Sequence, residues 1–233
     1  MEACSGTEAG RILSDPGLQV GQKVQEFIRY YNRARGSGAD SWQVSKDEWQ
    51  RYEFLGDRVL NLVAAGLLYG QSPPCREGVM SPMMGVVSNE SLSAIAGRRG
   101  IDITRLVPAA IGQQHAYGDA IRGGAIEACI GAMYIAAGFE ATRVFVCDLL
   151  TGEIEQYDPS LNYKGRLQEY YQQIHMEKPE YREESRTGPE NKRVYTCSVR
   201  DPDGRLLGTG TGSSLTKAEQ AAAQEALRFL NIV

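Results

Sequence analysis

The sequence predicts an all-helical domain followed by a smaller α+β domain, and two observations carry this prediction. Up to about residue 150, apolar residues recur at helical spacing, without the alternation typical of a half-buried strand. After an acidic, turn-prone segment, the pattern changes to one helix, three strand-like runs and a last helix. An α-β-β-β-α order over about 70 residues is typical of a compact α+β domain.

The domain boundaries follow from these changes of pattern. Residues 1–15 are small and polar and are predicted to form an N-terminal tail, and residues 16–151 are predicted to form the helical domain. The acidic segment 152–160 contains Asp158-Pro159-Ser160 and is predicted to be a linker. Residues 161–233 then form the α+β domain.

The helical domain is predicted to contain five helices, whose ends are marked by Gly, Ser and Pro. These predicted helices span residues 20–32, 47–69, 80–99, 117–137 and 142–150. Ser81 and Pro82 suit the start of the third helix as cap and first-turn residue, and Gly138 is expected to end the fourth. The run Phe54-Leu55-Gly56 in the second helix is expected to be buried.

The α+β domain is predicted from turn clusters that separate short β-prone runs. The predicted strands span 181–185, 194–200 and 206–211, and the predicted helices span 163–174 and 216–230. Turn residues at 188–191 and 201–204 lie between the strands, and the second cluster contains Asp-Gly, which favours a hairpin. Thr216 and Glu219 have the spacing of a capping box at the start of the last helix.

Charge and composition restrict the class of protein. The chain carries 25 Lys and Arg against 29 Asp and Glu, a net charge of -4, which argues mildly against a nucleic-acid partner. The charge is uneven: residues 161–233 hold 11 basic against 10 acidic side chains, and the remaining 160 residues hold 14 against 19. The five Cys show no disulfide or zinc spacing, and no apolar run predicts a leader peptide or a membrane span. A cytoplasmic protein without membrane contact is expected.

An acidic pair in the second helix is the main candidate site. Glu53 and Asp57 are four residues apart and therefore share a helix face, where their like charges repel each other. A divalent cation relieves such repulsion, because hard cations bind carboxylate oxygens. The alternative from spacing alone is a pair of acids on a solvated face.

Two segments resemble the ribonuclease III family. The run Glu53-Phe54-Leu55-Gly56-Asp57 is similar to the family signature E-x-x-E-F-L-G-D, in which the first Glu is Gln50 here. Residues 123–132 are similar to the pattern A-D-x-x-E-A-x-I-G-A from Glu127 onward, whereas Gly124 stands where the family has Asp.

The resemblance implies a metal site. Asp57 and Glu127 would be catalytic, and Glu53, Asp57 and Glu127 would hold Mg²⁺, which Mn²⁺ could replace. Glu77 resembles a family position near the dimer interface and the catalytic valley, with a surface acid before a helix as the alternative. Independently of the resemblance, Asn61 follows Asp57 by four residues and could offer an outer oxygen ligand in place of the acid absent at Gly124.

Residues 161–233 resemble a double-stranded-RNA-binding domain. Tyr163–Tyr170 is similar to its first helix, Gly188-Pro189 to a loop that enters a minor groove, and residues 218–223 to its last helix. The resemblance implies contacts to duplex RNA from Gln168, Glu169, Pro189, Asn191 and Lys217. The family's pair of Lys at the start of the last helix is Leu215 and Thr216 here, so weak, salt-sensitive binding is expected.

Together the two resemblances imply a homodimeric endoribonuclease that cleaves double-stranded RNA by Mg²⁺-dependent phosphodiester hydrolysis and acts in RNA processing, such as rRNA or mRNA maturation. The departures at Gln50 and Gly124 leave an alternative open: a weakened or inactive relative that acts as a dsRNA-binding component of a ribonucleoprotein. A third possibility is a helical scaffold whose α+β domain contacts only protein.

Overall fold

The protein consists of two compact units, residues 1–157 and 158–233, in a computed structural model. The structure describes residues 7–72, 74, 76–111, 117–155, 162–174, 177–189 and 193–232. The division between the units falls inside the segment predicted to be the linker. The first unit is helical and the second is α+β, so the predicted fold class is confirmed.

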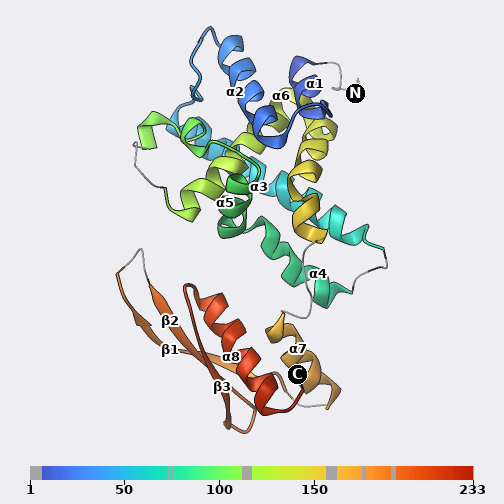
Figure 1. The fold of residues 1–233 in the computed structure, drawn as a ribbon, viewed down its shortest axis with the longest axis vertical. Helices are drawn as coiled ribbons and strands as arrows, with labels where there is room; N and C mark the ends of the chain where they lie inside the picture. Colours follow the sequence, from blue (N-terminus) through green and yellow to red (C-terminus); the bar gives the residue numbers. More distant parts are fainter. Residues whose placement is uncertain are drawn as a thin grey trace. The chain divides into compact units, whose positions relative to one another are not determined.

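The helical unit is built around one long helix (Figure 1). Its elements are α1 (Glu8–Ser14), α2 (Val20–Ala34), α3 (Lys46–Tyr69), α4 (Glu77–Met83), the 3-10 turn η2 (Met84–Val87), α5 (Asn89–Arg98), the 3-10 turns η3 (Ile103–Arg105) and η4 (Ala109–Ile111), and α6 (Asp119–Glu155). The helix α6 packs most extensively against α3, and also against α5 and α1. Its apolar side chains, such as Ile130, Met133 and Leu149, form the centre of the core.

The composition of α6 reflects this central position. By length and hydropathy the stretch Asp119–Ile154 could cross a membrane, but 56% of its most apolar window is buried inside the unit, as expected of a core helix. Gly138 interrupts it with φ 77°, a left-handed conformation that glycine adopts without steric cost. The predicted break at Gly138 is therefore a kink, and the predicted helix 142–150 continues directly after it.

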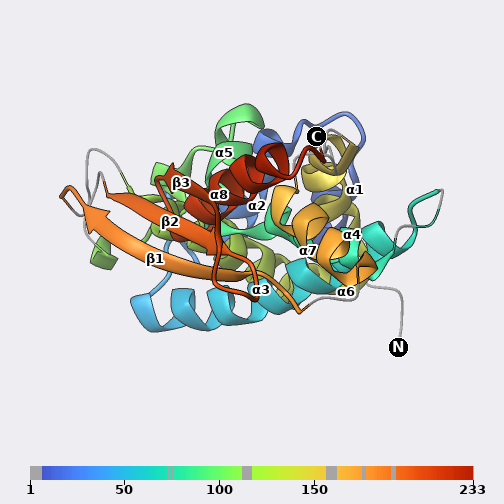
Figure 2. The same cartoon turned by 90° about the horizontal axis from the view of Figure 1, so that it is seen from below.

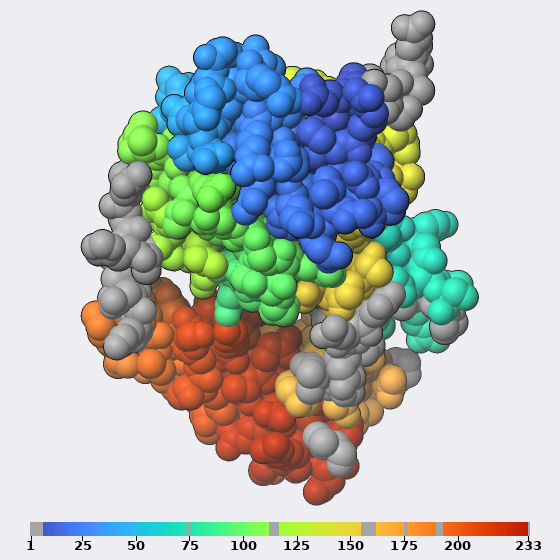
Figure 3. All heavy atoms as spheres, turned by 45° about the horizontal axis from the view of Figure 1, so that its top comes forward, coloured from blue at the N-terminus to red at the C-terminus, as the bar shows by residue number. Residues whose placement is uncertain are grey.

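A short helix lies where the sequence was expected to form a tail. Thr7 caps α1 by accepting a hydrogen bond from the backbone N–H of Gly10 at 3.0 Å. Ala9 and Leu13 are fully buried, and α1 packs on α6 and α2. In Figure 3 the blue atoms of α1 and α2 form one continuous surface. The prediction missed α1 because only two apolar positions, one turn apart, mark its buried face.

The predicted single helix 80–99 is wrong. It consists of α4, η2 and α5 instead, and Pro82 lies inside α4 near its end rather than in a first turn. Ser88 begins α5 by accepting a hydrogen bond from the N–H of Ser91 at 3.3 Å. The break has two causes. Pro82 has no backbone N–H and therefore cannot donate a hydrogen bond within the helix, and the Ser88 hydroxyl accepts a hydrogen bond at the start of a new helix.

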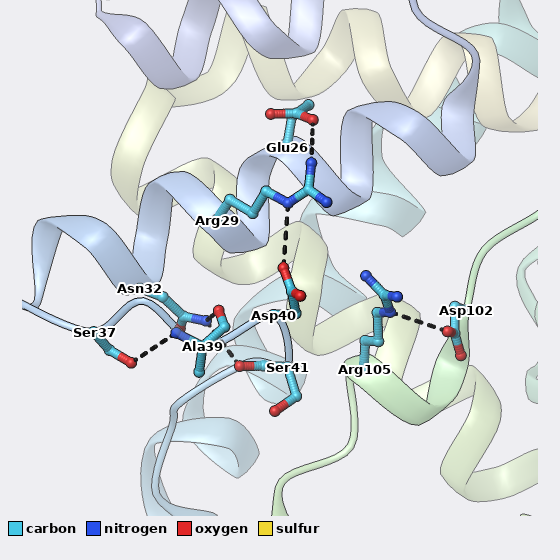
Figure 4. Close-up of polar contacts among 9 residues, drawn as sticks. All are labelled: Glu26, Arg29, Asn32, Ser37, Ala39, Asp40, Ser41, Asp102 and Arg105. Atoms are coloured by element: carbon cyan, nitrogen blue, oxygen red, sulfur yellow. Dashed lines mark hydrogen bonds and ion pairs between the residues drawn. The ribbon is translucent and has the colours of Figure 1, made fainter.

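Asn32 organises the connection between α2 and α3. Its side chain is fully buried and donates to the carbonyls of Ala39 and Ser41, at 2.7 and 2.8 Å (Figure 4). Its carbonyl oxygen accepts from the N–H of Gln43 at 2.9 Å. One amide thereby satisfies three backbone groups, which holds the loop in place before the helix that carries the candidate site.

The second unit has an antiparallel sheet of order β1-β2-β3 covered on one face by helices (Figures 1 and 2). Its elements are α7 (Tyr163–Gln173), β1 (Glu180–Thr187), β2 (Val194–Arg200), β3 (Leu206–Gly212) and α8 (Leu215–Phe229). The helix α8 lies directly on β3, because Gly210 leaves its backbone close to that of Ala222. Leu167 and Tyr171 of α7 and Val199 of β2 complete the core.

The start of α8 differs from the prediction. Ser214 is the cap and accepts from the N–H of Lys217 at 3.3 Å, so Thr216 lies inside the helix and the predicted capping box is wrong. The side chain of Glu219 instead accepts from the ammonium of Lys164 at 2.5 Å, which joins α7 to α8.

Candidate active site

The candidate site lies where α3 and α6 cross at very short range. A side chain at Gly56 would collide with the backbone of Glu127, and one at Gly131 would collide with the backbone of Tyr52. Two glycines thus let the two helix backbones touch. This crossing brings the acidic face of α3 to the face of α6 that carries Glu127.

Glu53 and Glu127 approach each other at this crossing. Glu127 is only 9% exposed, and Glu53 is half-buried on the facing turn of α3. The Glu53 carboxylate lies against α6 at Gly124, where an added Cβ would be 2.5 Å from its Oε1. The ring of Trp49 borders the same space, at 3.3 Å from that Cβ position.

The electrostatics of the crossing disfavour negative charge. Burial raises the pKa of Glu127, the like charge of Glu53 raises it further, and the value reaches about 7 although Arg58 acts in the opposite direction. Burial also raises the pKa of Glu53. A raised pKa on a buried carboxylate beside a second one is typical of functional sites.

Asp57 has partners of its own one turn further along α3. Its carboxylate pairs with the neighbouring Arg58. Its Oδ1 accepts from the amide nitrogen of Asn61 at 2.8 Å, and its backbone carbonyl accepts from the same nitrogen at 2.7 Å. Asn61 therefore presents a donor to Asp57, whereas the sequence analysis expected it to offer an oxygen to a metal.

The donor set is compatible with a hydrated divalent cation. Glu53 and Glu127 are hard oxygen donors in mutual repulsion, and Mg²⁺ takes one or two carboxylates while keeping several waters. Within the described ranges, no three His, Cys, Asp or Glu side chains form a group that could hold a metal. The three-carboxylate site of Glu53, Asp57 and Glu127 therefore stays a prediction.

Comparison with known proteins decides the family. A family model described as Ribonuclease-III-like matches residues 40–154, and the Double-stranded RNA binding motif matches residues 163–230. Ribonuclease 3 of Magnetococcus marinus is 36% identical over 188 residues, which are 78% of this chain and 75% of that protein. The chain belongs to the ribonuclease III family. Ribonuclease 3 of Cereibacter sphaeroides is 32% identical over 212 residues, 90% of this chain and 91% of that one. Ribonuclease 3 of Corynebacterium diphtheriae is 37% identical over 188 residues, covering 78% and 74%.

The two departures from the ribonuclease III motifs, Gln50 and Gly124, lie in different surroundings. Gln50 is exposed on α3 and lines a shallow surface depression with Asp47, Arg51 and Phe54. Gly124 is buried and faces Glu53. The Glu53 carboxylate lies against the backbone of Gly124, a contact between two helices that no spacing within either motif could reveal.

The expectation that Phe54 is buried was wrong. Phe54 is 66% exposed, with the guanidinium of Arg58 over its ring at 5.0 Å from the centroid. Leu62 and Tyr69 are 62% and 82% exposed on the same side of α3, since the three positions fall within about 80° of arc. In this ribonuclease III relative, α3 therefore has a buried face with Val59 and Leu60 and an apolar exposed face.

The remaining predicted residues belong to other elements than α3 and α6. Glu77 begins α4, is exposed, and accepts from the hydroxyl of Ser81 at 2.9 Å. In the second unit, Gln168 and Glu169 lie on α7, Gln168 half-buried and Glu169 exposed, while Pro189 is exposed after β1 and Lys217 is exposed in the first turn of α8. Asn191 lies outside the described residues.

Sequence reasoning missed two residues that shape the site. Trp49 borders the space that holds the Glu53 carboxylate, and its position one turn before Glu53 was an available signal. Arg58 pairs with Asp57 and lowers the pKa of Glu127, although it directly follows the signature. Both residues lie on α3. Trp49 shares the face of Glu53, so a helical projection would have found it, whereas Arg58 lies about 140° around the helix from Glu53 and would not have been found.

Proposed function

We propose that this protein is an endoribonuclease that cleaves double-stranded RNA by Mg²⁺-dependent hydrolysis of phosphodiester bonds and acts in cytoplasmic RNA processing, such as rRNA or mRNA maturation. The observation that carries the proposal is the buried Glu127 beside Glu53 at the α3–α6 crossing, in a chain that also contains a double-stranded RNA binding motif. A chain that only needed the fold would be more stable without two facing carboxylates.

Glu53 and Glu127 would hold the cation, with Asp57 as a third oxygen donor once its carboxylate leaves Arg58. Mg²⁺ or Mn²⁺ in such a site lowers the pKa of a bound water and neutralises charge on the phosphate. Glu127 must be ionised to bind the cation, and its pKa of about 7 makes this deprotonation part of metal binding. Below neutral pH the protonated Glu127 therefore weakens the site.

The second unit would deliver duplex RNA to this site. Domains of this kind recognise the shape of A-form RNA through phosphates and 2′-hydroxyl groups. Leu215 and Thr216 begin α8 without positive charge, and Lys164 is already paired with Glu219. The first turn of α8 therefore supplies one cation, Lys217, for phosphate contacts, and we expect weak binding that salt reduces further.

A cleavage assay tests the activity. The full chain is incubated with a long end-labelled duplex RNA and Mg²⁺, beside an E127Q variant and an EDTA control. We expect cleavage of the duplex and not of single strands, with loss of cleavage in E127Q and in EDTA. E140Q is a matched control, because Glu140 is an exposed acid on the same helix.

A second candidate function follows from Gly124 and Gln50. A relative without the full set of acids would bind duplex RNA without cutting it. Binding that saturates while the duplex stays intact, at high protein concentration with either Mg²⁺ or Mn²⁺, would refute the endonuclease and support this dsRNA-binding component.

By the same family resemblance, we infer that the chain forms a homodimer through the exposed face of α3. Phe54, Leu62 and Tyr69 expose an apolar stripe there, and Phe54 borders the surface depression with Asp47 and Arg51. Contiguous exposed apolar patches often mark surfaces through which proteins associate.

Sedimentation equilibrium tests the dimer. Wild type should sediment at about twice the 25.6 kDa chain mass, and a charged F54E variant should sediment as a monomer. I135E is the control, since Ile135 is 63% exposed on α6, almost as much as Phe54. A monomeric wild type, or a dimeric F54E, would contradict the inference.

A further inference from the structure

Asn61 lies one turn after Asp57 on α3 and makes two hydrogen bonds to it. Its amide nitrogen donates to the backbone carbonyl of Asp57 at 2.7 Å and to Oδ1 of the Asp57 carboxylate at 2.8 Å. Both partners are acceptors, so the NH₂ group of the amide, and not its oxygen, must face Asp57. Asn61 is therefore a donor that ties the Asp57 carboxylate to the backbone of its own helix.

The bond to the carboxylate distinguishes Asn61 from other polar side chains in the helices of this unit. Such side chains often bond only to the carbonyl four residues earlier, as Thr151 does with the carbonyl of Cys147 at 2.6 Å. Asn is also a poorer helix former than Leu, so its presence in the middle of α3 costs helix stability. The second hydrogen bond gives Asn61 a role at the candidate site that Thr151 does not have.

The two oxygens of the Asp57 carboxylate have partners of different mobility. Oδ2 pairs with Arg58, a long side chain that is 64% exposed, and an exposed ion pair of this kind separates at little cost. Oδ1 is bonded to Asn61, which is short and half-buried and is also anchored to a backbone carbonyl. A cation can therefore replace Arg58 at Oδ2 while Asn61 keeps its bond to Oδ1.

We propose that Asn61 is a positioning residue for Asp57: its hydrogen bond holds Oδ1, fixes the orientation of the carboxylate, and leaves Oδ2 for the divalent cation. The inference rests on the proposed metal-dependent function of this site. It makes Asn61 a donor to a ligand, and its amide oxygen is not itself a ligand. Residues that hydrogen-bond a metal-binding carboxylate typically contribute about tenfold or more to metal affinity.

Mn²⁺ binding to the RNA-free full chain, followed by electron paramagnetic resonance, tests this role without a cleavage reaction. N61L removes the donor and nearly keeps the size of the side chain, so it should weaken Mn²⁺ affinity about tenfold while urea unfolding stays cooperative. N61S should show the same loss, because its shorter side chain reaches the carbonyl but not the carboxylate as well. T151V is the matched control: it removes a bond to a backbone carbonyl alone and should bind Mn²⁺ as wild type does.

A double-mutant cycle shows whether Asn61 acts through the carboxylate of Asp57. D57A removes this carboxylate and leaves the carbonyl that accepts the other hydrogen bond from Asn61. N61L should therefore cost about tenfold in Mn²⁺ affinity in the wild type, but less than about threefold in the D57A background. An amide oxygen that bound the cation directly, or an Asn61 that only stabilised the helix, would give the same cost in both backgrounds.

The outcomes separate the positioning role from the proposed nuclease. Wild-type Mn²⁺ affinity in N61L and N61S, equal costs of N61L in both backgrounds, or no Mn²⁺ binding by the wild type would overturn the positioning role. Coupled Mn²⁺ binding in a chain that leaves duplex RNA intact would support the positioning role and refute the proposed nuclease.

Discussion

Replacing Glu127 by glutamine should stabilise the metal-free protein at pH 8 while removing its activity. The pKa of Glu127 is about 7 in the folded chain against 4.5 for a free side chain, because of burial and the charge of Glu53. At about 1.4 kcal/mol per pKa unit, ionising this group above pH 7 costs the fold about 3 kcal/mol. Glutamine has nearly the same shape and carries no charge, so E127Q avoids this cost.

The pH window of this effect follows from the direction of the shift. The folded state holds the proton more tightly than the unfolded state, so the contribution to stability is complete below pH 4.5 and is lost as pH rises through 7. E127Q should therefore unfold at nearly the same urea concentration as wild type at pH 5. At pH 8 it should gain up to about 3 kcal/mol in the free energy of unfolding.

Urea unfolding in EDTA, followed by tryptophan fluorescence, measures this difference. The chain has two Trp, Trp42 and Trp49, and both lie buried in the helical unit, so the signal reports the unit that holds Glu127. E140Q serves as control, since Glu140 is an exposed acid on α6 and should change stability little at either pH. Equal effects of E127Q at both pH values, or destabilisation at pH 8, would refute the electrostatic account.

Three further predictions test the fold and the RNA-binding surface. N32A removes a buried amide with three backbone hydrogen bonds and should cost about 2–4 kcal/mol in urea unfolding; a loss below about 0.5 kcal/mol would contradict its role. G56A places a methyl group against the backbone of Glu127 and should destabilise the helical unit by more than about 4 kcal/mol, seen as loss of the cooperative thermal transition; a wild-type melting temperature would show that the helices can separate freely. L215K/T216K adds two cations at the start of α8 and should raise the affinity for duplex RNA about tenfold. In a gel-shift series at increasing KCl, the slope of log affinity against log salt concentration should steepen by roughly two. An unchanged slope would place the start of α8 away from the phosphates.

Much of the fold followed from local patterns. The predicted helix 47–69 agrees with α3 within one residue, and all three predicted strands overlap β1, β2 and β3. Clear turn residues mark the ends of these elements, and α3 also has strong helical periodicity with one buried face, whereas β1 is almost wholly exposed. The failures arose where several local signals competed, as at Pro82 and Ser88, or where few apolar residues mark an element, as in α1.

The site could be predicted only in part, for a physical reason. Glu53 and Asp57 share a face because of helix geometry, and their half-buried position at the edge of the core agrees with the prediction. The contact of Glu53 with Gly124 joins residues about 70 positions apart and depends on where two helices cross. The exposure of Phe54 depends likewise on which face of α3 packs on α6, and local hydrophobicity does not determine this.

The cost of the Glu53–Glu127 pair favours the enzyme over a chain that only binds RNA. Burial and like charge both raise the pKa of Glu127, and one amide substitution would relieve both effects without changing side-chain size. An RNA-binding component gains nothing from this unfavourable pair, because its contacts lie in the other unit. A cation between the two carboxylates relieves their repulsion, and this relief favours metal binding. The two facing carboxylates therefore account both for the lower stability of the metal-free site and for the proposed metal binding.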